Sequence, residues 1–82
     1  MTREEGMARI LKVMRDVFDT DHLQYEDGLA PGAIAGWDSL KHVRLMVALE
    51  TEFGIRFTSG EVDDLENAGQ MLEVIVLRSS AA

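Results

Sequence analysis

Apolar residues recur at helical spacing along most of this chain, and the recurring stretches start after residues that can cap a helix. The first stretch follows Thr2 and continues to about Phe18. Its apolar positions, three and four residues apart, are Met7, Ile10, Leu11, Met14, Val17 and Phe18. Thr2 and Glu5 have the spacing of a capping box, in which each side chain bonds a backbone donor of the first turn. The pattern predicts an amphipathic helix over this segment.

The most regular pattern lies between Asp38 and Gly54. Asp38 is a good N-cap, because its carboxylate can accept from free N–H groups of the first turn, and glycine enters the left-handed C-terminal conformation cheaply. The spacing predicts a helix from about Ser39 to Phe53, so a serine stands on its first turn. Its core-facing side chains are expected to be Leu45, Met46, Leu49 and Phe53.

The same helix carries a second apolar stripe, well separated from the first on a helical wheel. It consists of Leu40, Val43 and Val47, spaced i, i+3, i+7. One interpretation is that this stripe packs on another helix of the chain, since a small bundle can surround a central helix. The other is an exposed patch beside Ser39 on which other proteins dock. The sequence leaves both open.

The remaining segments predict a long connection and two further helices. The connection, residues 19–37, has turn signals and five apolar anchors: Leu23, Tyr25, Leu29, Ile34 and Trp37. Residues 55–57 form a short apolar link that should pack into the bundle. A capping pattern at Thr58 predicts a short helix that ends at about Leu65. A second capping pattern at Asn67 predicts a last helix whose Met71, Leu72 and Ile75 face the core. Arg78 is expected to meet the negative end of that helix, and residues 79–82 to fray. The fold class is therefore all-α, one four-helix domain over residues 1–82 with a long first loop and a short third helix.

At this point the residues carry a family resemblance. Asp38-Ser39-Leu40, followed by Ala48-Leu49-Glu50 and then Glu52-Phe53-Gly54-Ile55 at this spacing, resembles the acyl carrier protein family. The resemblance covers about residues 11–75 and is densest between residues 37 and 55. It implies a four-helix bundle whose motif serine carries 4′-phosphopantetheine, with acyl groups held as thioesters on the terminal thiol.

The resemblance also assigns roles to particular positions. It places the covalent 4′-phosphopantetheine on Ser39 and lets Asp38 assist the modification, besides capping the helix. The partners it implies are a phosphopantetheinyl transferase, an acyl- or aminoacyl-loading enzyme, and downstream transferases and synthases. The residues expected to bind these partners are Leu40, Lys41, Val43, Arg44 and Val47.

Basic residues near the start of this helix depart from the family's usual pattern. Carriers of housekeeping fatty-acid synthesis have acidic residues along the corresponding helix, whereas this chain has Lys41, His42 and Arg44. The reversed charges favour different partners. We therefore expect a stand-alone carrier of a specialised, polyketide-like or other secondary pathway; the alternatives are a peptidyl- or D-alanyl-type carrier, or a helical interaction module with no prosthetic group. His42 projects onto the core stripe and is expected to be a half-buried packing residue.

Composition narrows the function further. The 82 residues have a net charge of −7, which argues against nucleic acid as a partner and favours partners with basic surfaces. There is no cysteine, so any thiol chemistry would come from a prosthetic group. We find no nucleophile elbow and no metal-ligand spacing, and expect neither a catalytic nor a metal site. With no signal-peptide-like or membrane-length apolar run, the expectation is a cytoplasmic protein without membrane insertion, and a monomer.

Overall fold

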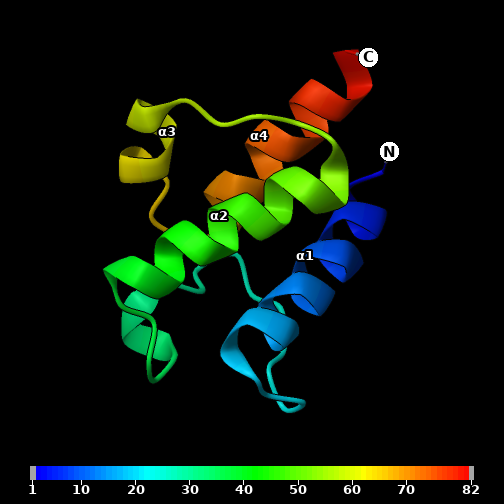
Figure 1. Cartoon of the computed structure of the whole chain (residues 1–82). Helices are drawn as coiled ribbons and strands as arrows, with labels where there is room; N and C mark the ends of the chain where they lie inside the picture. The colour runs from blue at the N-terminus through cyan, green and yellow to red at the C-terminus, as the bar shows by residue number, and fades with distance from the viewer. Residues whose placement is uncertain (1, 82) are drawn as a thin grey trace.

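The structure is a computed structural model that describes residues 2–81, with side chains through Ser79. Its helices begin after residues whose side chains can cap them. Helix α1 spans Arg3–Phe18, α2 Ser39–Phe53, α3 Ser59–Asp64 and α4 Ala68–Ala81, and a 3₁₀ turn, η1, spans Pro31–Ala33. All regular structure within residues 2–81 is helical. In Figure 1, α2 crosses the centre of the molecule with α1 and α3 on either side of it. The predicted all-α bundle is confirmed, with its long first connection and short third helix.

The predicted caps form, with two changes of partner. Thr58 and Glu61 make a complete capping box, with each side chain accepting from the other residue's backbone N–H. Thr2 accepts from the Glu5 backbone at 3.1 Å, but the Glu5 carboxylate takes the Thr2 hydroxyl instead of a backbone donor. At α4, a capping box would have the Gln70 side chain accept from the Asn67 N–H, but it accepts from the Glu66 N–H instead. The bonds that Thr2 and Thr58 accept from the Glu5 and Glu61 N–H groups satisfy first-turn donors that a helix leaves unpaired.

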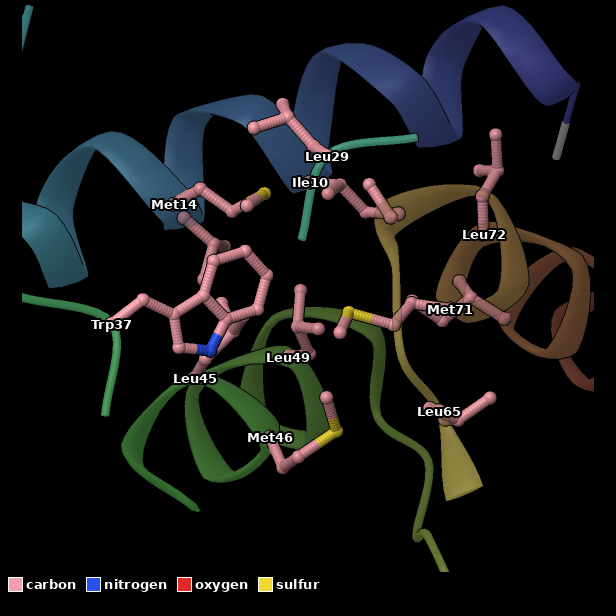
Figure 2. Packing of buried hydrophobic residues seen from close by; sticks show 13 residues of the cluster. Ile10, Met14, Leu29, Trp37, Leu45, Met46, Leu49, Leu65, Met71 and Leu72 are labelled. Carbon is pink, nitrogen blue, oxygen red and sulfur yellow. The ribbon is translucent and has the colours of Figure 1, made fainter. Parts of the chain in front are cut away.

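The core lies between α1, α2 and α4 and is closed by the loop before α2. Its fully buried large side chains are Ile10, Met14, Leu45, Met46, Leu49, Met71, Leu72 and Ile75. Figure 2 shows them with Trp37, whose indole is turned inward from the loop. Leu11, expected in the core, is only half-buried, while Val13 is buried. The cause is rotation: Leu11 lies about 100° from Ile10 around the helix and so falls on the edge of the stripe.

The long connection between α1 and α2 is fastened to the N-terminus of α4. The backbone N–H groups of Ala68 and Gly69 donate to the carbonyls of Leu29 and Asp27, each at 2.9 Å. Asp27 in turn accepts from the Arg3 guanidinium and the Tyr25 hydroxyl, both at 2.7 Å. Partial burial and the bond to Asp27 hold the pKa of the Tyr25 hydroxyl above its usual range. Loop carbonyls therefore supply the cap that α4 needs.

Two arginines join helices in ways the sequence did not show. Arg9 on α1 bonds the Glu52 carboxylate at 2.9 Å and lies 4.4 Å from the centre of the Phe53 ring, which ties α1 to the end of α2. Arg78 was expected to meet the end of its own helix. Instead it bonds the Arg56 carbonyl at 2.6 Å and the Glu61 carboxylate.

The end of α4 also differs from the sequence expectation. Residues 79–82 were expected to fray, whereas α4 continues to Ala81. Ala82 lies outside the residues that the structure describes.

The close approach of the loop to α4 gives a stability prediction at Gly69. A Cβ built there would lie 3.0 Å from the Asp27 Cβ and carbonyl oxygen, so Gly69→Ala must push the loop away. We expect it to lower the free energy of unfolding by about 1 kcal/mol or more, measured by urea denaturation.

The matched control is Gly60→Ala on α3, where the nearest side-chain contact would be an ordinary 3.9 Å. Alanine is the better helix former by ~1 kcal/mol, so Gly60→Ala should be neutral or stabilising. A Gly69→Ala protein as stable as Gly60→Ala would contradict the role given to the loop contact.

Candidate functional site

The turn before α2 buries one residue and exposes the next two. Gly36 adopts a positive φ of 86°, and the Asp38 N–H donates to its carbonyl at 3.0 Å. Trp37 is only 6% exposed, and its ring centre lies 5.1 Å from that of Phe18. Asp38 and Ser39 are both exposed. The buried indole therefore anchors the turn that carries the serine at the surface.

Asp38, not Ser39, caps the helix. Its carboxylate accepts from the Lys41 backbone N–H at 2.8 Å, as predicted. Ser39 is the first residue of α2, at the end where the free N–H groups give the helix its partial positive charge. The cap leaves the serine hydroxyl available at the surface. An anion attached to that oxygen would sit at a favourable helix terminus, although the Asp38 charge opposes it.

Ser39 lines a surface hollow of about 650 Å³ between the loop, the start of α2 and α3. The walls are mostly apolar, and three carboxylates stand among them. The lining residues are Ala30, Pro31, Trp37, Asp38, Ser39, His42, Val43, Val62, Asp63, Leu65 and Glu66. The sequence predicted Asp38, Ser39 and Val43 as site residues, but it predicted neither the hollow nor the part of its wall that α3 supplies. No spacing signal links α3 to Ser39, because only the chain's return path through residues 55–58 brings the two together.

His42 has partners that the sequence did not reveal. Its Nδ1 lies 3.2 Å from the Trp37 Nε1, and its Nε2 lies 2.9 Å from the Val62 carbonyl oxygen. The ring is half-buried, as expected of a packing residue. It also connects the loop, α2 and α3 at the hollow.

The second apolar stripe of α2 is at the surface. Leu40 is 60% exposed, Val43 49% and Val47 54%, so packing within the chain, the first of the two interpretations, is excluded. Arg44 is exposed and falls within about 100° of these residues around the helix. Lys41 differs: it is half-buried, and its Nζ donates to the Val17 carbonyl at 3.1 Å, near the C-terminus of α1. Its charge is directed toward a helix end within the chain.

Within the part of the chain that the structure describes, no three His, Asp or Glu side chains are grouped so that they could hold a metal ion. Over the same residues, no helix has the length and apolar character to cross a bilayer.

The fold and the site together define a class: a small helical bundle that presents a serine hydroxyl at the start of its second long helix. A family model described as "Phosphopantetheine attachment site" matches residues 7–75. The chain belongs to this family, whose prosthetic group is covalently attached phosphopantetheine. The acyl carrier resemblance noted in the sequence is thereby confirmed.

A solved structure gives the same result. The chain is similar to the holo acyl carrier protein from Geobacter metallireducens, with 29% identity and a TM-score of 0.86. The similarity covers 93% of this chain and 87% of that one. A comparison with curated proteins finds no match.

Asp38 caps α2 and Ser39 does not, so substitutions at these two residues should differ in their effect on stability. Asp38→Ala removes the cap and should lower the free energy of unfolding by about 1 kcal/mol, whereas Asp38→Asn keeps an acceptor and should cost far less. Ser39→Ala changes an exposed side chain outside the cap and should stay within about 0.5 kcal/mol of the parent. Thermal or urea denaturation of the three variants measures this, and a large loss in Ser39→Ala would show that the hydroxyl is structural.

Proposed function

We propose that this chain is a carrier protein whose phosphopantetheine is attached to Ser39. The observation that supports this most directly is the position of Ser39: exposed, first in α2, and within the segment that matches the family. In the modification, the Ser39 Oγ would lose its proton and form a new P–O bond, while the pyrophosphate bond of coenzyme A breaks and adenosine 3′,5′-bisphosphate leaves. When bound, the group supplies a thiol that holds acyl or aminoacyl cargo as a thioester.

Asp38 is proposed to take part in the modification as well as in capping. Its second carboxylate oxygen is not needed for the bond to Lys41, and the side chain is exposed beside Ser39. It can therefore help the modifying enzyme bind its metal ion and donor. The Asp38→Asn variant, which keeps the cap, separates the two roles: slower modification at unchanged stability would indicate participation of the charge.

The exposed stripe of α2 is proposed to bind partner enzymes. Leu40, Val43 and Val47 adjoin Ser39 on one helix face, and Arg44 borders them. An apolar centre with a charged border is the usual anatomy of a protein interface. Lys41 contributes less than the sequence suggested, because it is bonded to α1. The partners would be a phosphopantetheinyl transferase, a loading enzyme and downstream transferases or synthases.

The pathway is proposed to be a specialised one. The net charge of −7 favours partners with basic surfaces overall. Arg44 is a local exception, because it places a positive charge on the docking face where carriers of fatty-acid synthesis have acids, so an acidic group opposite Arg44 is favoured at that point. A peptidyl- or D-alanyl-type carrier shares the bundle and the serine and is the alternative for the cargo. An interaction module without a prosthetic group is disfavoured by the match to the attachment-site family.

Attachment at Ser39 is tested by intact mass. The chain is incubated with coenzyme A and a broad-specificity phosphopantetheinyl transferase, and the mass should rise by one phosphopantetheinyl group. Ser39→Ala should show no gain. Ser59→Ala is the matched control, because Ser59 is also an exposed first residue of a helix following a capping side chain, and it should be modified normally. Modification of Ser39→Ala would refute the proposed site.

Docking on α2 is tested by the kinetics of the same reaction. Val43→Asp and Val47→Asp should raise the KM for the carrier roughly tenfold, the effect of losing an interface contact of ~1–2 kcal/mol, with little change in stability. Leu77→Asp on α4, where the leucine is 70% exposed, is the control and should leave KM unchanged. Equal effects of all three substitutions would mean that the stripe has no special role.

A further inference from the structure

The carbonyl of Val62 lacks its usual helical donor. In a continuing helix it would accept from the Glu66 N–H, four residues further along. That N–H donates instead to the Gln70 Oε1 at 2.8 Å, and α3 ends at Asp64. The last carbonyls of a helix need partners from outside it. The Val62 carbonyl has one on α2, where the His42 Nε2 lies 2.9 Å from its oxygen. His42 therefore takes the place of a capping group for the C-terminal end of α3.

The two polar contacts of His42 assign a role to each nitrogen of its ring. A carbonyl oxygen can only accept, so Nε2 carries a proton and donates to Val62. An indole N–H can only donate, so Nδ1 accepts from the Trp37 Nε1 at 3.2 Å. The two rings are also stacked, with their centres 6.0 Å apart and 22° between their planes. His42 thus links the end of α3 to the turn that presents Ser39.

The His42 bond acts at the end of α3 that the other polar contacts leave unsupported. α3 has six residues, none of them fully buried, although Val62 packs partly against the core. Arg78 bonds the Glu61 side chain, in the first turn of α3, and the Arg56 carbonyl, which precedes the helix. The bond between His42 and Val62 is made closer to the C-terminal end. Both His42 and Val62 line the hollow, so this bond sets the place of its α3 wall.

The α3 wall brings charge to the hollow. Asp63 on α3 and Glu66 just after it line the hollow together with Ser39. Both acidic residues are exposed, and the lining residues include no lysine or arginine. The net charge of −7 favours partners with basic surfaces. Basic groups of such a partner would meet these two carboxylates beside Ser39 only while α3 keeps its position.

We propose that His42 is a positioning residue: by capping α3, it holds Asp63 and Glu66 at a set place beside Ser39, where partner enzymes recognise them. The cap itself is independent of the proposed function, whereas its use in recognition rests on Ser39 being the attachment site. A histidine that only packed could be replaced by an apolar side chain of similar size without loss. A capping histidine can be replaced only by a side chain with a donor. His42→Leu and His42→Gln therefore separate the two roles.

The first test uses NMR spectroscopy of the unmodified full chain. At about pH 8 the wild-type His42 ring should show a protonated Nε2 and an unprotonated Nδ1. In His42→Leu, hydrogen-exchange protection of the Val62 and Leu65 N–H groups should fall roughly five- to tenfold, as expected for loss of one hydrogen bond, while α1 stays protected. The indole N–H signal of Trp37, the only tryptophan, should shift because its acceptor is gone. His42→Gln, whose amide can both donate and accept, should keep most of the protection.

The second test uses the kinetics of the transferase reaction at Ser39. His42→Leu should raise the KM for the carrier roughly two- to fivefold with kcat little changed, because Ser39 and Asp38 are intact while α3 is less firmly placed. His42→Gln should restore most of the wild-type KM. His22→Gln changes the other histidine, which is exposed and distant in sequence, and should alter neither constant.

The two carboxylates are tested directly by Asp63→Asn and Glu66→Gln. Each should raise the KM, and the effect should shrink at high salt, because interactions between exposed charges are screened. Asp64→Asn is the matched control, since Asp64 is an exposed acid of the same helix but is not among the residues that line the hollow. It should raise the KM less than either of the other two.

The proposal is overturned if the wild-type ring carries its proton on Nδ1, if His42→Leu keeps the protection of α3, or if His42→Gln loses as much protection as His42→Leu. An unchanged KM in His42→Leu, or equal effects of all three acidic substitutions, would overturn the role in recognition. A wild-type chain that gains no mass with coenzyme A would refute the proposed function instead. The exchange measurements involve no phosphopantetheine and would still decide whether His42 caps α3.

Discussion

Burial of Trp37 directly before two exposed residues is the constraint on which the site depends. The indole fills the space between Phe18 and the interior of the bundle, so the chain must emerge into solvent at Asp38. Burial of an aromatic side chain of this size contributes several kcal/mol to the free energy of folding, and this holds the turn in place. The start of α2 is thereby held at a fixed position relative to the core, with Ser39 outside.

The two faces of α2 have different environments. Leu45, Met46 and Leu49 are almost fully buried and hold the helix in the bundle, while Val43 and Val47 remain about half exposed. α3 lies near the same end of α2, but it does not cover these side chains. A helix that keeps apolar side chains in solvent beside the proposed attachment site has the arrangement expected of a docking surface.

α3 is the least firmly packed of the helices and also one wall of the Ser39 hollow. Val62 packs against the core, and the polar connections of α3 are the ion pair between Arg78 and Glu61 and the bond between His42 and the Val62 carbonyl. The Thr58 backbone N–H and the Arg78 guanidinium hold the pKa of the Glu61 carboxyl below its usual value, so this pair persists well below neutral pH. The His42 bond is the tie on the side of α3 that lines the Ser39 hollow.

The sequence alone determined the helices, their caps at Asp38 and Thr58, the buried stripe of α2 and the motif around Ser39, because these depend on local spacing and on residues a few positions apart. It did not determine whether Val43 was covered, that Lys41 is turned to α1, that Arg78 reaches the start of α3, or that His42 joins Trp37 to Val62. Those contacts link residues distant in sequence or depend on rotamers chosen by packing. Only the tertiary structure, which brings α3 back beside the start of α2, decided them.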